Sequence, residues 1–347
     1  MIVRRATIQD NEKLIALTGL APMEGIISLR IDRKPDFFEL LRKRGNYIVL
    51  VAELEQQLIG SVSCSMHYAV VNGNVYPVYY LGDLKVHPLY TRSPVAFRLL
   101  KAMAEELKRI NADLVLCTTA AGNTAVQKLF KGARAGFTPF ENTGVFKVHQ
   151  LLPRKCNRVF PFISVHQPMA RLDSFYQNYF SRFSLHPLIK TESDSTHYIW
   201  QKDQEIKAAA TVFNPLPFKQ NVVIGHPFFT GMLLILLRIS KKVYPLPEVP
   251  VKNQPLKILY IRYYAFVPGA EKEFLAILKK IRHDAFQNGF HFVSFTVQEK
   301  DSILEKLVGP QSMFTFQSNG YITSLQQHPL LLKQINTGIT FEDYSVI

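Results

Sequence analysis

The order of predicted strands and helices repeats in the two halves of the chain, and this repeat limits the possible folds most strongly. The first half alternates strands and helices over 2–6, 10–17, 35–44, 47–52, 58–64, 79–86, 94–110, 113–119, 123–131 and 145–148. The second half repeats much of this order over 198–212, 257–266, 274–285, 290–297 and 302–308, before a last hairpin predicted to turn at Asn319-Gly320. Two copies of one α/β unit fit this pattern better than a single domain of 347 residues.

The composition is that of a soluble globular protein, with 47% hydrophobic and 20% charged residues. No run reaches the roughly 18 apolar residues of a membrane span, and the apolar run at 231–237 predicts a buried helix. The N-terminus lacks the long apolar core of a signal peptide. We therefore expect a cytoplasmic protein without a membrane partner.

The chain is basic, with 41 Lys and Arg against 27 Asp and Glu, and both halves carry the excess. A diffuse positive field favours anionic ligands such as phosphates, nucleotides or acidic surfaces, although an ordinary basic surface has the same composition. Nucleic acid is not favoured as a partner, because the sequence has no zinc finger, no RNA-recognition aromatic motif and no dense basic stripe.

The cysteines and histidines indicate no metal site. Cys64 and Cys117 lie in strand-like runs and are predicted to be reduced core thiols, while Cys156 stands apart from both. The ten histidines contain no pair at the spacing of metal ligands. We expect neither a structural nor a catalytic metal.

One strand–turn–helix stretch has the layout of a phosphate site. An apolar strand ends at Val86, and a helical pattern begins near residue 94 with an apolar face on Leu99, Met103 and Leu107. Free backbone N–H groups at such a helix start bind phosphates, usually with glycine in the turn. This turn has no glycine and contains Pro94, so a capped helix without a ligand is the alternative interpretation.

Several local strings resemble those of the GNAT N-acyltransferase superfamily, well over residues 2–150 and only in element order over 196–325. They are LGDLKVHP at 81–88, Tyr90, Leu99-Leu100, NTAVQKLF at 123–130 and Gly136-Phe137. The resemblance implies an α/β (α+β) protein of two GNAT-like domains, each a mixed, mostly antiparallel twisted sheet flanked by helices. It also implies a GNAT-like domain at 1–150, a linker with opening helices at 151–195, and a degenerate GNAT-like domain at 196–347.

The resemblance implies acetyl-CoA or another acyl-CoA as the donor, with its pyrophosphate over residues 91–97. Thr91 then stands at the family's Arg/Gln position and Pro94 at its first glycine, and a shift of one residue gives Arg92 the arginine's place. Backbone groups of Leu84, Lys85 and Val86 are expected to hold the thioester and the pantetheine arm. The remaining predicted cofactor contacts are Thr91, Arg92, Ser93, Val95, Ala96, Phe97 and Asn123.

Acyl transfer to an amine needs a group that takes the amine's proton and an acid for the departing thiolate. By the resemblance, Asp83 is the candidate base, and a turn carboxylate without a catalytic role is the alternative. The family's tyrosine acid is replaced by Phe130, which leaves that role empty or assigned to Tyr90 or His149.

The second copy departs further, because its turn, Val267–Lys272, has one glycine and an acidic residue. We expect it to bind no cofactor and to shape the acceptor pocket. The predicted function is an acyl-CoA-dependent N-acyltransferase acting on a small-molecule or peptide amine. A catalytically silent GNAT-like binding protein and a Fem-like aminoacyl transferase are the alternatives. The sequence indicates neither the acceptor nor the oligomeric state.

Overall fold

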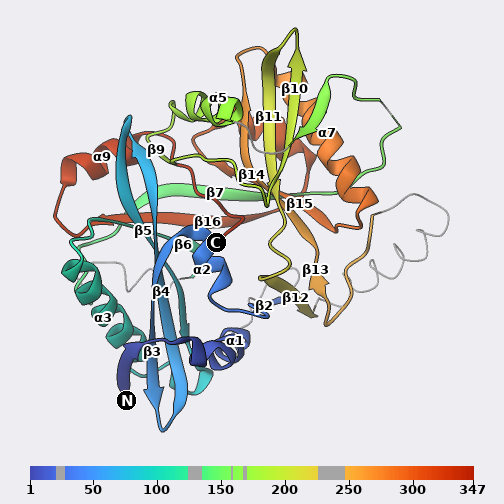
Figure 1. The fold of residues 1–347 in the computed structure, drawn as a ribbon. Helices are drawn as coiled ribbons and strands as arrows, with labels where there is room; N and C mark the ends of the chain where they lie inside the picture. Colours follow the sequence, from blue (N-terminus) through green and yellow to red (C-terminus); the bar gives the residue numbers. More distant parts are fainter. Residues whose placement is uncertain (21–27, 124–134, 158, 167–169, 226–246) are drawn as a thin grey trace.

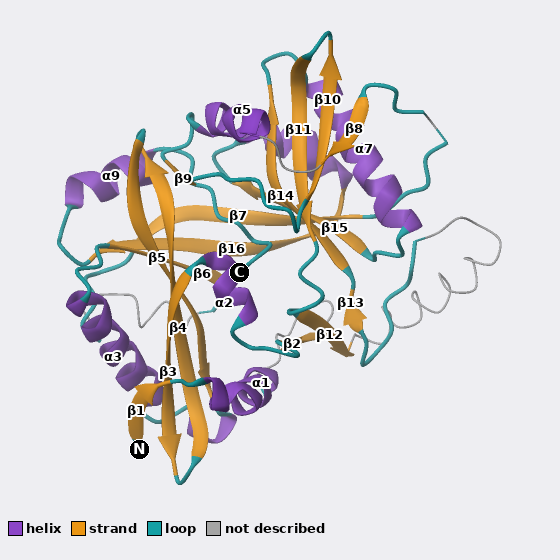
Figure 2. Ribbon diagram, viewed as in Figure 1, coloured by secondary structure: helices purple, strands orange, loops and turns teal. Residues whose placement is uncertain are grey.

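A computed structural model describes residues 1–20, 28–123, 135–157, 159–166, 170–225 and 247–347 (Figure 1). It has two α/β units that share one 13-stranded sheet in the described residues, mostly antiparallel and flanked by helices (Figure 2). The predicted class, two units with mixed sheets, is confirmed. No helix within the described ranges is long and apolar enough to cross a membrane.

The first unit is built on a meander of antiparallel strands followed by a parallel strand. Glu55 and Gln56 both have positive φ, of 51° and 64°, as the tight turn of a hairpin requires. Its strands are β1 (Ile2–Arg5), β3 (Asn46–Leu54), β4 (Gln57–Val71), β5 (Asn74–Val86), β6 (Leu114–Ala120) and β7 (Glu141–Leu151).

Helices cover both faces of the first unit's sheet, because its strands carry apolar residues on both sides. Leu50 and Ala52 pack in the same cluster as α3 (Val95–Arg109), whereas Val49 and Val51 pack with α1 (Asn11–Gly19) and α2 (Glu39–Arg44). Val95 of α3 lies close to Gly60 of β4. A Cβ on Gly60 of β4 would lie 2.6 Å from Cγ1 of Val95, so glycine permits this close approach.

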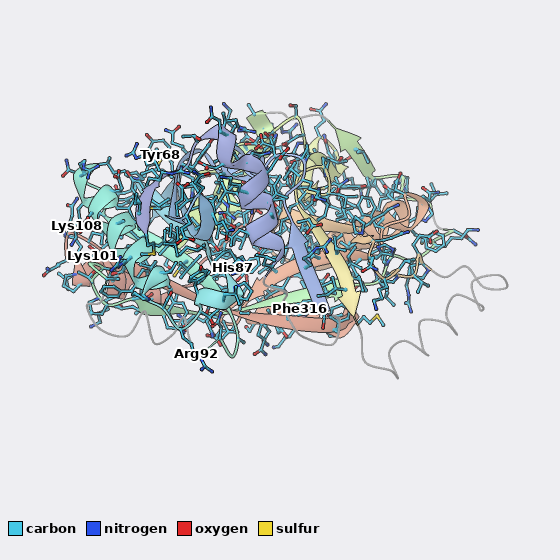
Figure 3. The ribbon with its side chains drawn as sticks, turned by 90° about the horizontal axis from the view of Figure 1, so that it is seen from below. Tyr68, His87, Arg92, Lys101, Lys108 and Phe316 are labelled. Carbon is cyan, nitrogen blue, oxygen red and sulfur yellow. The ribbon has the colours of Figure 1, made fainter. Side chains whose placement is uncertain are left out.

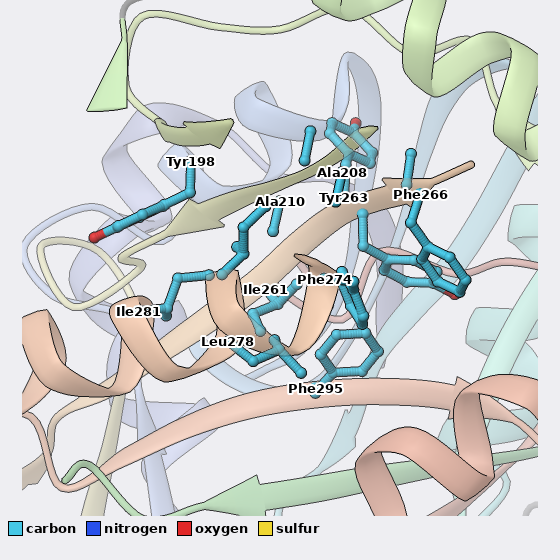
Figure 4. Packing of buried hydrophobic residues seen from close by; sticks show 14 of the residues in the cluster. Tyr198, Ala208, Ala210, Ile261, Tyr263, Phe266, Phe274, Leu278, Ile281 and Phe295 are labelled. Atoms are coloured by element: carbon cyan, nitrogen blue, oxygen red, sulfur yellow. The ribbon is translucent and has the colours of Figure 1, made fainter. Parts of the chain in front are cut away.

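The second unit repeats the arrangement. The strands β10 (Thr196–Lys202), β11 (Glu205–Phe213) and β14 (Ile258–Phe266) are antiparallel, and β15 (Phe292–Gln298) pairs in parallel with β14. Ala208, Ala209 and Ala210 of β11 are all fully buried, between α7 (Glu271–Gln287) and α5 (Ala170–Phe180). Figure 4 shows the apolar face of α7 against these strands.

The two units exchange their last strands. Strand β16 (Ser312–Ser324), from the end of the second unit, lies between β6 and β7, and β7 in turn pairs with β15. The predicted turn at Asn319-Gly320 is therefore wrong, since both residues lie within one strand. Gly320 serves close packing instead, because a Cβ there would lie 2.3 Å from Oγ1 of Thr143 and 2.6 Å from the Phe146 ring.

The remaining elements join the units or cover their edges. A small sheet links the halves through β2 (Ser28–Asp32), β12 (Gln220–Gly225) and β13 (Pro255–Leu256). The predicted linker contains β8 (Ile163–His166), α5 and β9 (Leu185–Pro187). The other elements are the 3₁₀ turns η1 (Ile8–Asp10), η2 (Pro88–Tyr90) and η3 (Gly309–Gln311), with helices α8 (Ser302–Val308) and α9 (Pro329–Thr337). The helices predicted at 123–131 and 231–237 lie, apart from Asn123, outside the described residues.

Candidate active site

The parallel strands β5 and β6 separate halfway along their length. Their pairing covers only Val78 to Tyr80 and Leu114 to Leu116. On their other edges, β6 pairs with β16 and β5 pairs with β4 along the whole length of each strand. At the root of this opening, the Tyr80 and Thr118 hydroxyls share a hydrogen bond of 2.6 Å. Beyond it, the edge of β5 that faces β6 has no ladder partner among the described residues, so its backbone groups are available to a ligand.

A bulge turns β5 at the same place. The register with β4 shifts between Ser61 and Ser63, and Asp83 has a φ of +49°, in the left-handed region that a non-glycine residue seldom adopts. The Asp83 carboxylate accepts from Ser63 Oγ at 2.7 Å. The backbone carbonyl of Asp83 accepts from Ser61 Oγ at 3.2 Å. The two serines therefore hold the bulge in a fixed conformation.

A cleft of about 310 Å³ occupies the opening. Its lining combines the bulge of β5, the end of β6, residues of or next to α1, β2 and α2, and Lys219 from the second half. Of the predicted site residues, the cleft brings together Asp83, Leu84, Lys85 and Asn123.

Asp83 is held as one partner of a buried ion pair. Nη1 of Arg33 lies 3.3 Å from Oδ1 of Asp83, and the two side chains are only 3% and 14% exposed. Burial alone would raise the pKa of Asp83, but Arg33, Arg44, Ser63 and Lys85 lower it below the usual value. A carboxyl that holds its proton this weakly is a poor proton acceptor at neutral pH.

The cleft is otherwise cationic. Burial, reinforced by Arg33 and Arg44, lowers the pKa of Lys219 to about 7, and its Nζ donates to the Ile347 oxygen. Burial also lowers the pKa of Lys85, while Asp83 opposes the shift. Sequence reasoning missed Arg33, Arg44 and Lys219, because they come from unrelated elements. The basic composition was the only signal of such a site.

The start of α3 offers fewer donors than its sequence suggests. Pro94 is the N-cap, and its carbonyl accepts from the Arg98 N–H at 2.9 Å. The N–H of Ser93 is already donated to the Tyr90 carbonyl at 3.0 Å, which removes one of the expected donors. Val95, Ala96 and Phe97 begin the helix, so their N–H groups have no acceptor within it.

The side chains of this turn point mainly to solvent. Thr91, Arg92 and Phe97 are exposed, Ser93 and Ala96 are half-buried, and Val95 is buried in the core. Figure 3 shows Arg92 reaching outward from the turn, near His87. None of these residues lines the cleft, and neither does Val86.

The remaining predictions concern the cysteines, His149, Phe130 and a metal site. Cys64 and Cys117 are buried free thiols, as predicted. His149 lies between Thr315 and Glu305, with ring nitrogens 2.9 Å and 3.1 Å from their oxygens, and lines neither this cleft nor the cavity described below. Phe130 lies outside the described residues. Within the described ranges, no group of three His, Cys, Asp or Glu side chains could hold a metal.

Comparison with known sequences finds a family match within the first unit. The profile of the Acetyltransferase (GNAT) family matches residues 16–137. A relative named "Probable N-acetyltransferase HLS1" from Arabidopsis thaliana is 27% identical over 152 residues, which are 42% of this chain. The match spans only 37% of that relative's length.

Comparison with solved structures extends the likeness to both units. Saccharomyces cerevisiae N-myristoyltransferase with bound myristoyl-CoA aligns over 92% of this chain and 82% of its own, with a TM-score of 0.59 and 14% identity. A GCN5-related N-acetyltransferase from Anabaena variabilis aligns over 93% of this chain and 72% of its own, with a TM-score of 0.51 and 12% identity. At these identities the likeness is one of fold. The chain is thus similar to the GNAT family in sequence over residues 16–137, and to these N-acyltransferases in fold over both units.

Proposed function

We propose that the protein is an acyl-CoA-dependent N-acyltransferase that uses the first unit's opening, with acetyl-CoA or another acyl-CoA as donor. The observation that carries the proposal is the opening between β5 and β6, which leaves the backbone of β5 available beside a cationic cleft of about 310 Å³. Among the relatives, the N-myristoyltransferase structures contain bound myristoyl-CoA, which supports this class of donor.

The proposed roles follow from the position of each residue. Backbone groups of Leu84, Lys85 and Val86 bind the thioester carbonyl and the pantetheine arm along the unpaired edge of β5. The N–H groups of Val95, Ala96 and Phe97 bind the pyrophosphate at the start of α3. Arg92 adds a positive charge beside them, with Thr91 and Ser93 completing the turn, and Asn123 lines the cleft near the arm.

The acceptor is proposed to be a primary amine of a small molecule or a peptide. Nucleophilic attack by the amine forms the amide and releases the thiol of CoA. No metal takes part in this proposal, because amine attack on a thioester needs only proton transfer and stabilisation of the carbonyl oxygen.

Calorimetric titration with acetyl-CoA, followed by a thiol-release assay over a panel of amines, tests the proposal. We expect binding and amine-dependent thiol release. Binding without release from any acyl-CoA would favour the silent GNAT-like alternative. That alternative agrees with the missing donors at the start of α3, where the Ser93 N–H is already bonded and Pro94 has no N–H. No binding of any acyl-CoA would exclude the donor class and leave the Fem-like alternative.

A further inference from the structure

A second cavity, of about 410 Å³, lies between the two units on the other side of Tyr80. Its walls come from the end of α2, the middle of β4, the segment after β9, β14 and the C-terminal residues 341–347. It shares Arg44, Tyr80 and Ile347 with the cleft at the opening, so the two cavities meet at these residues. A volume of this size suits a small ligand.

Most charged groups around this cavity are already paired. Arg262 lies 2.7 Å from an Asp343 oxygen and 2.9 Å from a Glu192 oxygen, and Lys43 lies 2.6 Å from Asp194. Lys190 and Glu342 are the exceptions, because neither side chain makes a hydrogen bond or ion pair within the part of the chain that the structure describes. Lys190 is exposed, whereas Glu342 is buried, with 9% of the residue exposed.

Arg44, which lines both cavities, also has an incomplete set of hydrogen-bond partners. Its guanidinium lies 4.5 Å above the Tyr80 ring, and its Nε donates to the Val346 carbonyl. Its Nη1 is fully buried, close to Gly82, and has no hydrogen-bond partner among the described residues.

Glu342 lines this cavity together with Arg44 and Tyr80, which also line the cleft at the opening. It interacts electrostatically with Tyr80 and Cys117, which lie on β5 and β6 at the root of the opening. Burial, opposed by Arg44 and reinforced by Asp343, raises the pKa of the Glu342 carboxyl to about 8. A carboxyl with this pKa exchanges protons near neutral pH, unlike Asp83.

We propose that this cavity binds the acceptor as a primary ammonium group on an apolar body, and that Glu342 takes a proton from it. The apolar body packs against Met66, Leu188, Tyr263 and Phe341 of the wall. The inference rests on the proposed acyl transfer and names its acceptor class and its base.

The ammonium group gives one proton to the Glu342 carboxylate and becomes a neutral amine. The amine nitrogen attacks the thioester carbon, a C–N bond forms, and the C–S bond breaks. The second proton leaves the nitrogen and ends on the sulfur as the thiol of CoA. Glu342 then releases its proton to water.

Asp83 has a positioning role in this scheme. Both of its carboxylate oxygens already have partners, Arg33 and Ser63, and the bond from Ser63 joins the bulge of β5 to β4. The roles of Glu342 and Asp83 can therefore be distinguished by experiment, because only Glu342 sets the pH dependence of the rate.

The binding test uses phenethylamine as the probe, by ligand-observed NMR with CoA present. We expect saturable binding that is weakened at least tenfold by Leu188→Trp, which fills the cavity from its exposed wall. Leu330→Trp, on the exposed face of α9, is the matched control and should leave binding within twofold. The alcohol 2-phenylethanol, which has the same body without the amine, should bind at least tenfold more weakly.

The catalytic test measures thiol release from acetyl-CoA with the same probe between pH 6 and pH 9.5. Glu342→Gln should lower kcat/KM by about 10²–10⁴-fold with unchanged acetyl-CoA affinity. The ratio of wild-type to Glu342→Gln rates cancels the titration of the free amine. This ratio should rise with pH through about 8 and then level off, because the wild type works only when Glu342 is deprotonated.

Several variants serve as controls for this profile. Glu342→Asp should restore part of the rate, whereas Glu205→Gln, at an exposed hairpin, should change nothing. Asp83→Asn should lower the rate without changing the pH profile. The titratable and charged groups that share this cavity or interact with Glu342, and could shift the profile, are Lys43, Arg44, His67, Tyr68, Tyr80, Cys117, Lys190, Glu192, Arg262, Tyr263, Asp343 and Tyr344.

The outcomes separate the inference from the proposed function. The inference alone is overturned if acetyl-CoA binds and phenethylamine does not. It is also overturned if phenylalanine binds more tightly than phenethylamine, since the carboxylate of phenylalanine then selects the acceptor through Arg44. Bound amine without thiol release at any pH overturns the proton transfer, as does a Glu342→Gln rate within twofold of the wild type. Absence of acetyl-CoA binding overturns the proposed function, while the Leu188→Trp comparison still decides the cavity.

Discussion

Both units contain the same opening between two parallel strands, but this opening is a cleft in the first unit and is filled by side chains in the second. In the first unit the parallel pairing ends at Tyr80 and Leu116, and in the second it ends at Tyr260 and Ser294, after the same three residue pairs. The first opening leaves a cleft of about 310 Å³. The second is filled with aromatic rings.

Side-chain size at matching positions explains the difference. One residue past the last pair, β6 has Cys117 where β15 has Phe295, which lies 4.9 Å from the Tyr264 ring and 6.1 Å from the Phe274 ring. All nine residues of β14 are buried, whereas Gly82 to Val86 of β5 are half-buried. Figure 4 shows Phe295 and Phe274 packed together beneath β14.

The helix starts differ in charge as well as in shape. The first turn of α3 has no acidic residue, whereas the first turn of α7 contains Glu271 and Glu273. Carboxylates at a helix start interact favourably with its free N–H groups and repel phosphate. The same backbone arrangement therefore leaves a cleft in one copy and forms a core in the other, depending on a few side chains.

The largest effect is expected from emptying the filled opening. Phe295→Ala removes a fully buried ring and leaves a cavity, so the free energy of unfolding should fall by about 3–5 kcal/mol. Urea titration measures this change. Calorimetry with acetyl-CoA should show binding only at the first unit, because an apolar cavity lacks the donors that the cofactor needs. A second binding event in this variant would mean that Phe295 alone separates the two copies.

Filling the open cleft is the converse change. Ala120 is exposed and lines the cleft, so Ala120→Trp should block it without altering the core. We expect acetyl-CoA to bind about 100-fold more weakly, equal to about 2.7 kcal/mol, by calorimetry. Ala120→Ser is the control and should bind as the wild type does. Unchanged affinity in the tryptophan variant would show that the cofactor does not use this cleft.

Changes at the start of α3 should have intermediate effects. Pro94→Gly restores an N–H at the N-cap and should tighten acetyl-CoA binding by up to about tenfold, or about 1.4 kcal/mol. Arg92→Glu should weaken binding by a similar factor, because its charge repels the pyrophosphate. Salt titration of the affinity serves as the check. If neither variant moves the affinity, the phosphates bind elsewhere.

The smallest effect is expected at the start of α7. Glu271→Gln removes a favourable charge from the first turn, so the free energy of unfolding should fall by about 0.3–1 kcal/mol. Acetyl-CoA should still bind only to the first unit, since the aromatic rings and not the charge close the second opening. Gain of a second site would assign the difference to charge instead.

The sequence predicted the local elements well, because each depends on short-range patterns. The apolar spacing of Leu99, Met103 and Leu107 predicts α3, and the repeat of element order predicts the second unit. The same reasoning failed at Asn319-Gly320, since a glycine required for close contact between β16 and β7 has the appearance of a turn signal.

The candidate site likewise has features that local sequence predicts and features that depend on distant residues. Local strings around residues 81–97 were enough to predict the β5 strand end, the α3 start and the family's donor class. That Asp83 is paired with Arg33 could not be predicted, because 50 residues separate them and neither lies in a recognisable motif with the other. Its role as the base stays a prediction that its partners do not favour.

By itself, then, the sequence determined two α/β units and the position of one strand–turn–helix site, because hydrophobic periodicity and turn chemistry act over a few residues. Only the tertiary structure decided how the units exchange β7 and β16, and which charged groups meet at the opening. It also decided that Glu342 reaches a cavity lined by β4 and β14. These features depend on contacts between residues far apart in the chain, which side-chain packing sets and no local pattern records.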